Sequence, residues 1–321
     1  MMKSADRLMI AGATGLIGSA CVRHFSALDN FELFTPTRKE LELTDRVAIF
    51  EYVTTNKISS IIFAAGRVGG IVENNDHPAT LLDENIVVGL NGLWAAHKAS
   101  IDRMIVFGSS CMYPTDAPQP MREAALMTGK IEQTSVAYAT AKLALVQAAL
   151  AYNRQYPKGT FFVPVIPNST YGPCDDFDSR SSHVMAALIR KIHIAKQMDL
   201  NEIKIWGTGK PRREFVYSDD VASACAVLLN ADLSTLDEPI NITSGDELSI
   251  ADLAHTIAEV IGYRGRFVFD TSMPDGASRK ALCGEKMSAL GWLPSCSIVD
   301  GISQSYEWFQ QNLSSDECSY A

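Results

Sequence analysis

Short apolar runs recur along the first half of the chain, and stretches with helical spacing of apolar positions separate them. The runs lie at residues 8–11, 31–35, 61–66, 105–108 and 161–166. A run of this length is typical of a strand that is buried on both faces. The intervening stretches, notably 85–99 and 138–152, place apolar residues on one helix face. This alternation predicts an α/β fold, a Rossmann-type doubly wound parallel sheet with helices on both faces.

Beyond Pro167 the alternation gives way to a polar stretch at 171–182 and shorter elements. We expect a helix at 184–196, a strand and turn at 203–209, a helix at 219–229, a sheet strand at 240–242, a helix at 249–261 and a strand at 266–269. The division that follows is a Rossmann domain at 1–170 with about 215–245 added, a smaller α/β substrate-binding lobe at about 171–214 and 246–312, and a frayed tail at 313–321.

A glycine-rich turn directly follows the first predicted strand. Gly12, Gly15 and Gly18 lead into a stretch with helical spacing. In a strand–turn–helix unit, such glycines permit a tight turn, close approach of the backbone to a pyrophosphate, and close packing of the helix on the strand. The amides at the start of that helix attract phosphate. The turn predicts a dinucleotide site, although glycine turns also serve packing alone.

The residues after the second and third predicted strands bear on which dinucleotide binds. A fold that prefers NAD usually has an acidic residue after the second strand, whereas this chain has Arg38 and Lys39. A guanidinium suits a 2′-phosphate and stacks on adenine, which favours NADP(H). The alternative is an arginine in a solvated loop. Ala64 and Ala65 end the third strand, and their small side chains permit close approach of the cofactor.

Tyr138 and Lys142 are candidates for proton transfer. They lie four residues apart, so on a helix they share one face. A phenol titrates near ~10, and an ammonium one turn away is expected to favour the phenolate and lower its pKa. The fourth strand delivers Ser109 to its carboxyl end, where ligands of doubly wound sheets bind. Taken alone, the pair also fits a solvated helix face.

Composition and charge argue against several other classes of function. The chain has 321 residues, 47% hydrophobic and 20% charged, as in an ordinary globular protein. A net charge of −9 without a Lys/Arg cluster argues against nucleic acid as a partner. The apolar runs are shorter than the ~18 residues of a membrane span, and no signal-peptide pattern is present. Seven scattered cysteines without a CxxC pair indicate neither disulfides nor a metal site, so we expect a reducing cytoplasm.

Six longer motifs accompany the glycine turn. They are Val68-Gly69-Gly70-Ile71 with Asn74-Asn75; Gly108-Ser109-Ser110-Cys111-Met112-Tyr113-Pro114; Tyr171-Gly172-Pro173 with Asp175 and Phe177; Ser182-His183-Val184; Trp206-Gly207-Thr208-Gly209 through Arg213-Glu214-Phe215; and Pro274-Asp275-Gly276 through Arg279-Lys280. With these motifs, the chain resembles the extended short-chain dehydrogenase/reductase family, in its branch of nucleotide-sugar epimerases/reductases. The resemblance extends from the glycine turn to about Trp308.

The resemblance implies NADPH-dependent epimerisation and 4-keto reduction of a GDP-linked 4-keto-6-deoxy-hexose. It makes Tyr138 the general acid for O4, Lys142 the group that lowers its pKa and holds the nicotinamide ribose, and Ser109 a hydrogen-bond partner of the sugar. Cys111 and His183 become the acid/base pair for C3 and C5. A 4-keto group acidifies the protons on both carbons, and a thiol and an imidazole titrate close enough to neutrality to exchange them. Outside such motifs, a cysteine after a strand is usually a small buried hydrophobe, and a histidine at a helix start is usually a cap or surface residue.

The resemblance also implies binding residues and an assembly. The cofactor contacts are expected from Gly12, Thr14, Gly15, Leu16, Ile17, Gly18, Arg38, Ala64, Ala65, Phe107, Gly108, Ser109, Ser110, Tyr138, Lys142, Pro167, Asn168, Ser169, Thr170 and His183. The substrate contacts are expected from Lys191, Trp206, Arg213 and Asp275. The alternatives are core packing for Trp206 and solvated surface for Lys191. Helices 85–99 and 138–152 are expected to form a homodimer interface.

Four departures from the family pattern bear on the substrate. The segment 167–171 reads Pro-Asn-Ser-Thr-Tyr where Pro-Thr-Asn-Leu-Tyr is usual, so an asparagine has moved one place toward the N-terminus. Cys174 replaces a common histidine, Asp176 replaces an asparagine, and Asp178-Ser179-Arg180 is unlike the typical segment. Two alternatives therefore stay open: a 3,6-dideoxyhexose (GDP-colitose-type) synthase, and a reductase without epimerase activity. A catalytically silent dinucleotide sensor is disfavoured by the tyrosine–lysine pair.

Overall fold

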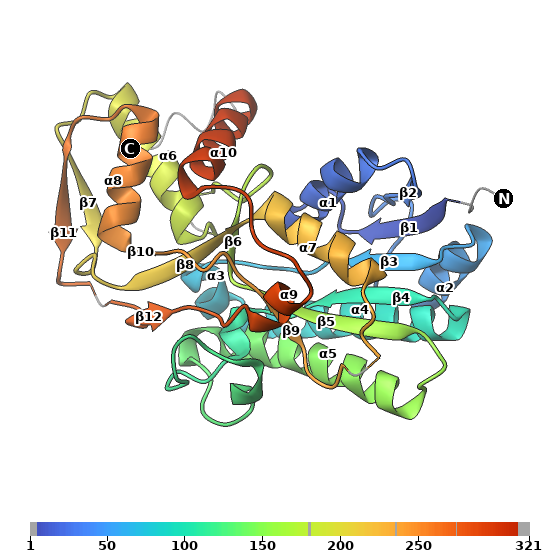
Figure 1. The fold of residues 1–321 in the computed structure, drawn as a ribbon. Helices are drawn as coiled ribbons and strands as arrows, with labels where there is room; N and C mark the ends of the chain where they lie inside the picture. Colours follow the sequence, from blue (N-terminus) through green and yellow to red (C-terminus); the bar gives the residue numbers. More distant parts are fainter. Residues whose placement is uncertain (1–4, 179–180, 235, 274, 314–321) are drawn as a thin grey trace.

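The chain is built around a six-stranded parallel sheet of strand order β2-β1-β3-β4-β5-β9 (Figure 1). A computed structural model describes residues 5–178, 181–234, 236–273 and 275–313. The motif residues Ser179, Arg180 and Pro274, the cysteine Cys318 and the tail from 314 onward lie outside the described residues. The six strands are β1 (Asp6–Ala11), β2 (Phe31–Phe34), β3 (Ser60–Phe63), β4 (Arg103–Phe107), β5 (Phe161–Pro167) and β9 (Ile240–Ile242).

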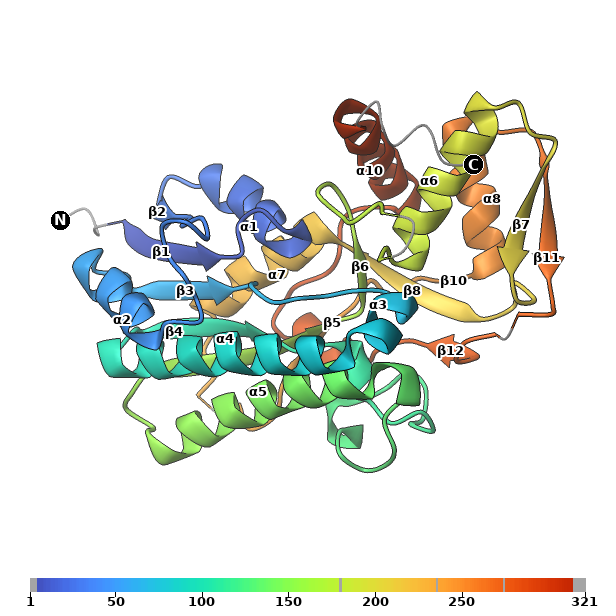
Figure 2. The same cartoon turned by 180° about the vertical axis from the view of Figure 1, so that it is seen from behind.

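Alternate residues of the central strands face opposite sides of the sheet and meet different helices. Leu8 and Ile10 of β1 share an apolar cluster with α1 (Leu16–Ser26) and α7 (Ser218–Asn230). Met9 and Ala11 share another with the helices of the opposite side, α2 (Arg46–Thr55), α4 (Pro78–Ala99) and α5 (Val136–Gln155). Figures 1 and 2 show the sheet between these layers. The prediction of a Rossmann-type doubly wound sheet is therefore confirmed.

Two helices of this domain are longer than their apolar spacing predicts. α4 begins at Pro78 instead of residue 85, because proline suits the first turn of a helix and Leu81 adds a buried position. α5 extends two residues before and three residues beyond the predicted 138–152. The two helices pack closely, since a Cβ atom on Gly89 of α4 would lie 2.4 Å from the Leu145 side chain of α5.

The later elements form a second group with its own apolar cluster, beyond the carboxyl ends of the central strands (Figure 1). Its small sheets pair β10 with β8 and β12, β6 with β8, and β11 with β7. The strands are β6 (Ser169–Tyr171), β7 (Glu202–Trp206), β8 (Arg212–Tyr217), β10 (Glu247–Ser249), β11 (Arg266–Asp270) and β12 (Arg279–Lys280). The cluster includes residues of the helices α6 (Val184–Gln197), α8 (Ile250–Ile261) and α10 (Ile298–Asn312).

Several short elements were not predicted. They are β6, β8, β10, β12, α3 (Ile71–Asp76) and α9 (Glu285–Ala289), and the longer α10 is also unpredicted. Over the described part of the chain, no helix combines the length and apolarity needed to cross a membrane.

Candidate active site

The glycine turn joins β1 to α1, and its three glycines have different surroundings. Gly12 has φ of +81°, and a Cβ atom there would lie 2.7 Å from the Ala65 backbone nitrogen. A Cβ atom on Gly18 would lie 2.0 Å from the Gly12 carbonyl oxygen. At Gly15 the nearest such atom is 3.6 Å away. Gly12 and Gly18 are therefore required by the fold itself, whereas Gly15 leaves an open approach to the start of α1, where a phosphate finds free amides.

Arg38 lies in the loop after β2, the strand beside β1. Its side chain is 87% exposed and, among the described residues, pairs only with Glu42, at 3.1 Å from Nε. An exposed pair between residues four apart holds its partners weakly. The guanidinium is accordingly available for a phosphate that extends from the glycine turn along this edge.

Ser109, Tyr138 and Lys142 converge at the carboxyl end of β4. Ser109 follows the strand after Gly108, and its hydroxyl is hydrogen-bonded to the Tyr138 phenol. Tyr138 and Lys142 lie on the first turns of α5 and are both buried. The Lys142 Nζ atom is 5.8 Å from the centroid of the Tyr138 ring. The predicted trio is thus brought together by one strand end and one helix.

The electrostatics of this trio differ from the sequence expectation. Burial raises the pKa of Tyr138, the charge of Cys111 raises it further, and the Ser109 hydrogen bond opposes the rise. Burial also lowers the pKa of Lys142 to about 8. The prediction that Lys142 lowers the Tyr138 pKa is therefore wrong for the free protein, because helical spacing does not reveal how deeply both groups are buried. A phenol that retains its proton suits the role of a general acid.

Cys111 lies on the 3₁₀ turn Ser110–Met112, directly after Ser109. The Ser109 hydroxyl accepts a hydrogen bond from the Cys111 amide at 3.3 Å. The Cys111 sulfur lies 3.5 Å from Nζ of Lys280, which belongs to β12. Ser109 thus contacts both Tyr138 and Cys111, and places the two reactive groups side by side.

His183 lies immediately before α6, at the edge of the second group of elements. The residue is exposed to solvent, although many protein atoms surround its ring. Burial lowers the pKa of His183, the Lys280 ammonium lowers it further, and Asp176 opposes both. The shared influence of Lys280 places His183 and Cys111 around one cation.

Four of the predicted cofactor residues lie at 167–170, where β5 ends and β6 begins, and one of them, Asn168, bonds to other parts of the protein. The Asn168 side chain is buried and donates to Glu214 Oε2 at 2.6 Å and to the Lys280 carbonyl at 3.4 Å. Glu214 also accepts from the Leu282 amide at 2.9 Å and the Gly245 amide at 2.6 Å. The asparagine that departs from the family pattern therefore joins the central sheet to β8 and β12.

Three of the predicted substrate residues lie at one rim of the second group. Trp206 ends β7 and is 66% exposed, which excludes core packing. Asp275 accepts hydrogen bonds from the Thr208 amide at 2.8 Å and the Thr208 hydroxyl at 2.7 Å. Arg213 donates to the Ala277 carbonyl at 2.6 Å. The rim combines a large aromatic face with a guanidinium, as binding of a nucleotide diphosphate requires.

Lys191 of α6 reaches the same rim from the other side of β7. Its Nζ donates to the Lys204 carbonyl at 2.6 Å, two residues before Trp206. Partial burial lowers the pKa of Lys191, as it does for Arg213. Lys191 is therefore anchored at the rim, although it remains exposed to solvent.

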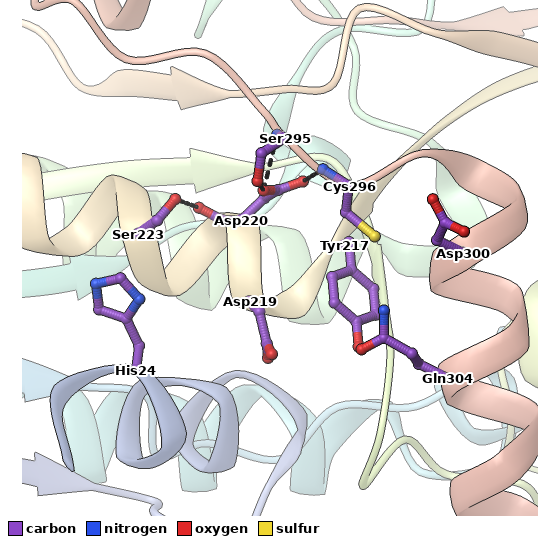
Figure 3. Close-up of a pocket in the computed structure, with 9 residues that line it drawn as sticks. All are labelled: His24, Tyr217, Asp219, Asp220, Ser223, Ser295, Cys296, Asp300 and Gln304. Atoms are coloured by element: carbon purple, nitrogen blue, oxygen red, sulfur yellow. Dashed lines mark hydrogen bonds between the residues drawn. The ribbon is translucent and has the colours of Figure 1, made fainter. Parts of the chain in front are cut away.

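A separate pocket of about 470 Å³ lies between α7, α10 and α1 (Figure 3). Asp220 there accepts hydrogen bonds from the Ser295 amide and hydroxyl and from the Cys296 amide. This carboxylate fixes the segment before α10 against α7. None of the predicted site residues lines this pocket, and in the described part of the chain no group of acidic, histidine and cysteine side chains is arranged to hold a metal ion.

Glu214 and Lys280 lie in two of the sequence motifs without a predicted role. Both make contacts across more than 40 positions of the chain, Glu214 with Asn168 and Lys280 with Cys111. Only the presence of a charge within each motif could have drawn attention to them.

Comparison with known proteins gives a consistent result. Residues 8–243 match the model of the NAD dependent epimerase/dehydratase family. The GDP-L-fucose synthase of Sinorhizobium fredii is 41% identical over 96% of this chain and 96% of that protein. The GDP-L-colitose synthase of Yersinia pseudotuberculosis is 34% identical over 97% of this chain and 100% of that protein. The structure of MlghC, a GDP-mannoheptose C4 reductase from Campylobacter jejuni with NADP bound, superposes with a TM-score of 0.85 at 30% identity, covering 97% of this chain and 100% of that chain.

Proposed function

This chain belongs to the NAD dependent epimerase/dehydratase family, and we propose that it makes GDP-L-fucose by NADPH-dependent epimerisation and reduction of a GDP-linked 4-keto-6-deoxy-hexose. The observation that carries the proposal is the position of Ser109. Its hydroxyl bonds both the Tyr138 phenol and the Cys111 amide. A group suited to protonate a ketone oxygen thus lies beside a thiol suited to exchange protons on the neighbouring carbons.

The residues at the edge of the central sheet fit NADP(H). Gly15 and the amides at the start of α1 would hold the pyrophosphate, and Arg38 would hold the 2′-phosphate. Lys142 holds the nicotinamide ribose, and the small residues Ala64 and Ala65 leave room beside the turn. When bound, the cofactor supplies the hydride for C4.

Reduction at C4 requires a proton for the oxygen that develops negative charge. Tyr138 supplies it, because its raised pKa keeps the phenol protonated at neutral pH. The Ser109 hydroxyl holds the ketone oxygen and the phenol in line. Lys142 lies one helical turn away and stabilises the phenolate that remains.

Epimerisation precedes reduction, while the 4-keto group still acidifies the protons on C3 and C5. One member of the Cys111–His183 pair removes a proton, and the electron pair of the broken C–H bond moves into an enolate. The other member returns a proton to the opposite face of that carbon. Exchange of the pair with water then restores both groups.

The nucleotide end of the substrate lies at the rim of the second group. Trp206 covers the base, and Arg213 and Lys191 neutralise the diphosphate. Asp275 holds the turn that follows Trp206, through its two bonds to Thr208.

The proposal extends to organisation and assembly. Residues 1–170 with about 215–245 bind NADP(H), and about 171–214 with 246–312 bind the nucleotide sugar. The protein acts in the cytoplasm as a homodimer through α4 and α5. Support for the dimer comes from the exposed apolar side chains of Leu90 on α4 and Val136 on α5, exposed by 39% and 38%.

A second candidate function is a related reductase, either one that acts on a 3,6-dideoxyhexose or one that does not epimerise. The loop before His183 supports this second candidate. Asp176, where the family has asparagine, accepts from the Ser181 hydroxyl at 2.5 Å and the Asp178 amide at 2.9 Å. Its negative charge opposes the lowering of the His183 pKa, so the proton-donating group differs electrostatically from the family pattern.

The deciding experiment is NADPH oxidation with GDP-4-keto-6-deoxy-mannose in deuterated water, followed by NMR of the product. The proposal expects oxidation, with deuterium at C3 and C5 and inverted configuration at both. Absence of turnover would refute the substrate. Reduction without deuterium at either carbon would leave the second candidate and remove the acid/base roles of Cys111 and His183.

A further inference from the structure

The motif at 68–75 contains none of the predicted site residues, and in the structure it leads into α3. Figure 2 shows this short helix at the end of α4, on the side of the central domain that faces the second group of elements. The Gly70 amide donates to the Ser181 carbonyl at 2.7 Å, although the two residues are far apart in the sequence. His183 follows two residues later, immediately before α6. The start of α3 thus contacts the second group directly beside a predicted site residue.

The contact of Gly70 with Ser181 and Ser182 leaves no room for a side chain. A Cβ atom on Gly70 would lie 2.7 Å from the Ser182 carbonyl oxygen and 3.1 Å from that of Ser181. The Gly70 backbone itself is extended, with φ of −69° and ψ of −169°, a conformation that other residues also adopt. Glycine is therefore required at this position by the neighbouring backbone and not by its own conformation.

Asn74 fixes the backbone of this contact from within α3. Its side chain is buried, and its Nδ2 atom donates to the Gly69 carbonyl at 2.8 Å and to the Gly70 carbonyl at 2.9 Å. The Oδ1 atom has no hydrogen-bond partner among the described residues, so the side chain acts through these two donated bonds. The Gly69 carbonyl and the Gly70 amide belong to one planar peptide group. By holding that carbonyl, Asn74 orients the amide that binds Ser181.

The rest of α3 is attached to the central domain. Arg67, ahead of the helix, pairs with Glu73 of α3 at 2.7 Å and with Glu84 of α4 at 3.3 Å. The Asn85 side chain of α4 donates to the Arg67 carbonyl at 2.9 Å. Because α4 packs on the central sheet, these bonds fix the position of the Gly70 amide relative to that sheet.

On its other side, Ser181 is attached to the second group of elements. Its hydroxyl donates to Asp176 at 2.5 Å. The next residue, Phe177, stacks on Trp308 of α10, with ring centroids 5.9 Å apart. The bond between Gly70 and Ser181 therefore joins α3 of the central domain to a segment that is anchored on α10.

We propose that Gly70 and Asn74 are positioning residues that set where His183 stands relative to the reactive groups on the central sheet. The inference rests on the proposed function. His183 belongs to the second group of elements, whereas Cys111 and Tyr138 belong to the central domain. Epimerisation uses groups from both parts on one carbon, so their relative position must be held to within about 0.5 Å. Hydride transfer and protonation of O4 use groups of the central domain alone.

The first test measures amide hydrogen exchange by mass spectrometry on the full-length free protein. Asn74→Asp keeps the shape of the side chain but turns a carboxylate toward two carbonyl oxygens, so both donated bonds are lost. Peptides that contain Gly70 and Ser182 should exchange about fivefold faster, the effect of one net hydrogen bond on local opening. Asn75→Asp is the matched control, because it makes the same change at the neighbouring exposed residue and should leave exchange as in the wild type.

The second test separates the two chemical steps. In Gly70→Ala, the Ser182 backbone must move by about 0.5 Å to restore van der Waals contact with the new methyl group. Gly70→Ala and Asn74→Asp should each slow deuterium exchange at C3 and C5 at least about tenfold. Hydride transfer measured in reverse, from GDP-L-fucose to NADP⁺ at saturating substrate, should change by less than about twofold, because the groups that it uses stay in place.

Equal losses in both steps would show that the two residues only support the fold, and would overturn the proposal. Unchanged deuterium exchange at C3 and C5 in the variants would overturn it as well. Should Gly70→Ala fail to fold, Asn74→Asp decides alone. If the wild type shows no deuterium exchange at C3 and C5, the proposed function fails, and the amide exchange of Asn74→Asp still decides whether Asn74 holds Ser181 and Ser182 in position.

Discussion

Alanine substitutions in the glycine turn should separate stability from cofactor binding. In Gly18→Ala the new methyl group would lie 2.0 Å from the Gly12 carbonyl oxygen and 2.6 Å from its carbon, both backbone atoms. The helix start must shift away from β1 to make room. In Gly15→Ala the nearest atom is 3.6 Å away, and φ of −81° at this position suits alanine. The fold therefore accommodates the second change but not the first.

The expected magnitudes differ accordingly. Overpacking by one methyl group against the backbone costs about 1–3 kcal/mol, of which the higher helix propensity of alanine returns about 0.5–1 kcal/mol. Gly18→Ala should thus unfold at lower temperature. For Gly15→Ala, the loss of a favourable helix cap and the gain from a stiffer unfolded chain cancel to within about 0.5 kcal/mol. Its methyl group instead occupies the path of the pyrophosphate, so NADPH should bind at least tenfold more weakly, or about 1.4 kcal/mol.

The assay is a pair of measurements on both variants, thermal unfolding followed by circular dichroism and NADPH titration followed by fluorescence. A Gly15→Ala protein with wild-type NADPH affinity would refute the placement of the pyrophosphate over this turn. A Gly18→Ala protein as stable as the wild type would refute the packing role assigned to Gly18.

Three further substitutions and conditions test the site. Tyr138→Phe should slow hydride transfer at least 10²-fold, because the proton donor is lost, and should weaken NADPH binding by a much smaller factor, because it removes one hydroxyl from one of many expected cofactor contacts; retained turnover would contradict the role of Tyr138. Because burial lowers the pKa of Lys142 to about 8, its ammonium disappears as pH rises through that value, so kcat/KM should fall there, and Lys142→Arg should move the fall to higher pH. Glu214→Gln places an amide N–H donor against backbone donors and should lower the free energy of unfolding by about 1–3 kcal/mol in urea titration, whereas Glu202→Gln, in the exposed ion pair with Arg266, should change it by less than about 1 kcal/mol.

The central sheet was predictable because its signals are local. β1, β3, β4 and β5 are runs of consecutive buried residues, and the glycine turn follows β1 in the same short stretch. The start of α4 was not, since the first turns from Pro78 lack the dense apolar spacing of the later ones. Local patterns fix which segment becomes a strand or helix, and leave its ends to capping and tertiary contacts.

The contacts that organise the candidate site join residues that are far apart in the sequence. β12 has only two residues and forms because β8 pairs with it, so no hydrophobic pattern in the sequence predicts this strand. The approach of Lys280 to Cys111 depends on that pairing, and the approach of Asn168 to Glu214 depends on the pairing of β6 with β8. The error in the expected Tyr138 pKa has the same origin, because burial is a property of the folded molecule and helical spacing gives only the distance to one neighbour.

Local contacts and contacts between distant parts of the chain support different chemical steps at the site. Ser109, Tyr138 and Lys142 are held by one strand end and one helix of the central domain, so hydride transfer depends on local structure. Lys280 belongs to β12 and His183 precedes α6. Lys280 reaches Cys111 only through the packing of the second group of elements on the central sheet. A small change in that packing should therefore weaken epimerisation before it weakens reduction. Asn168 joins the central sheet to the second group of elements through Glu214. Substitution of Asn168 should therefore reduce deuterium exchange at C3 and C5 while hydride transfer is retained.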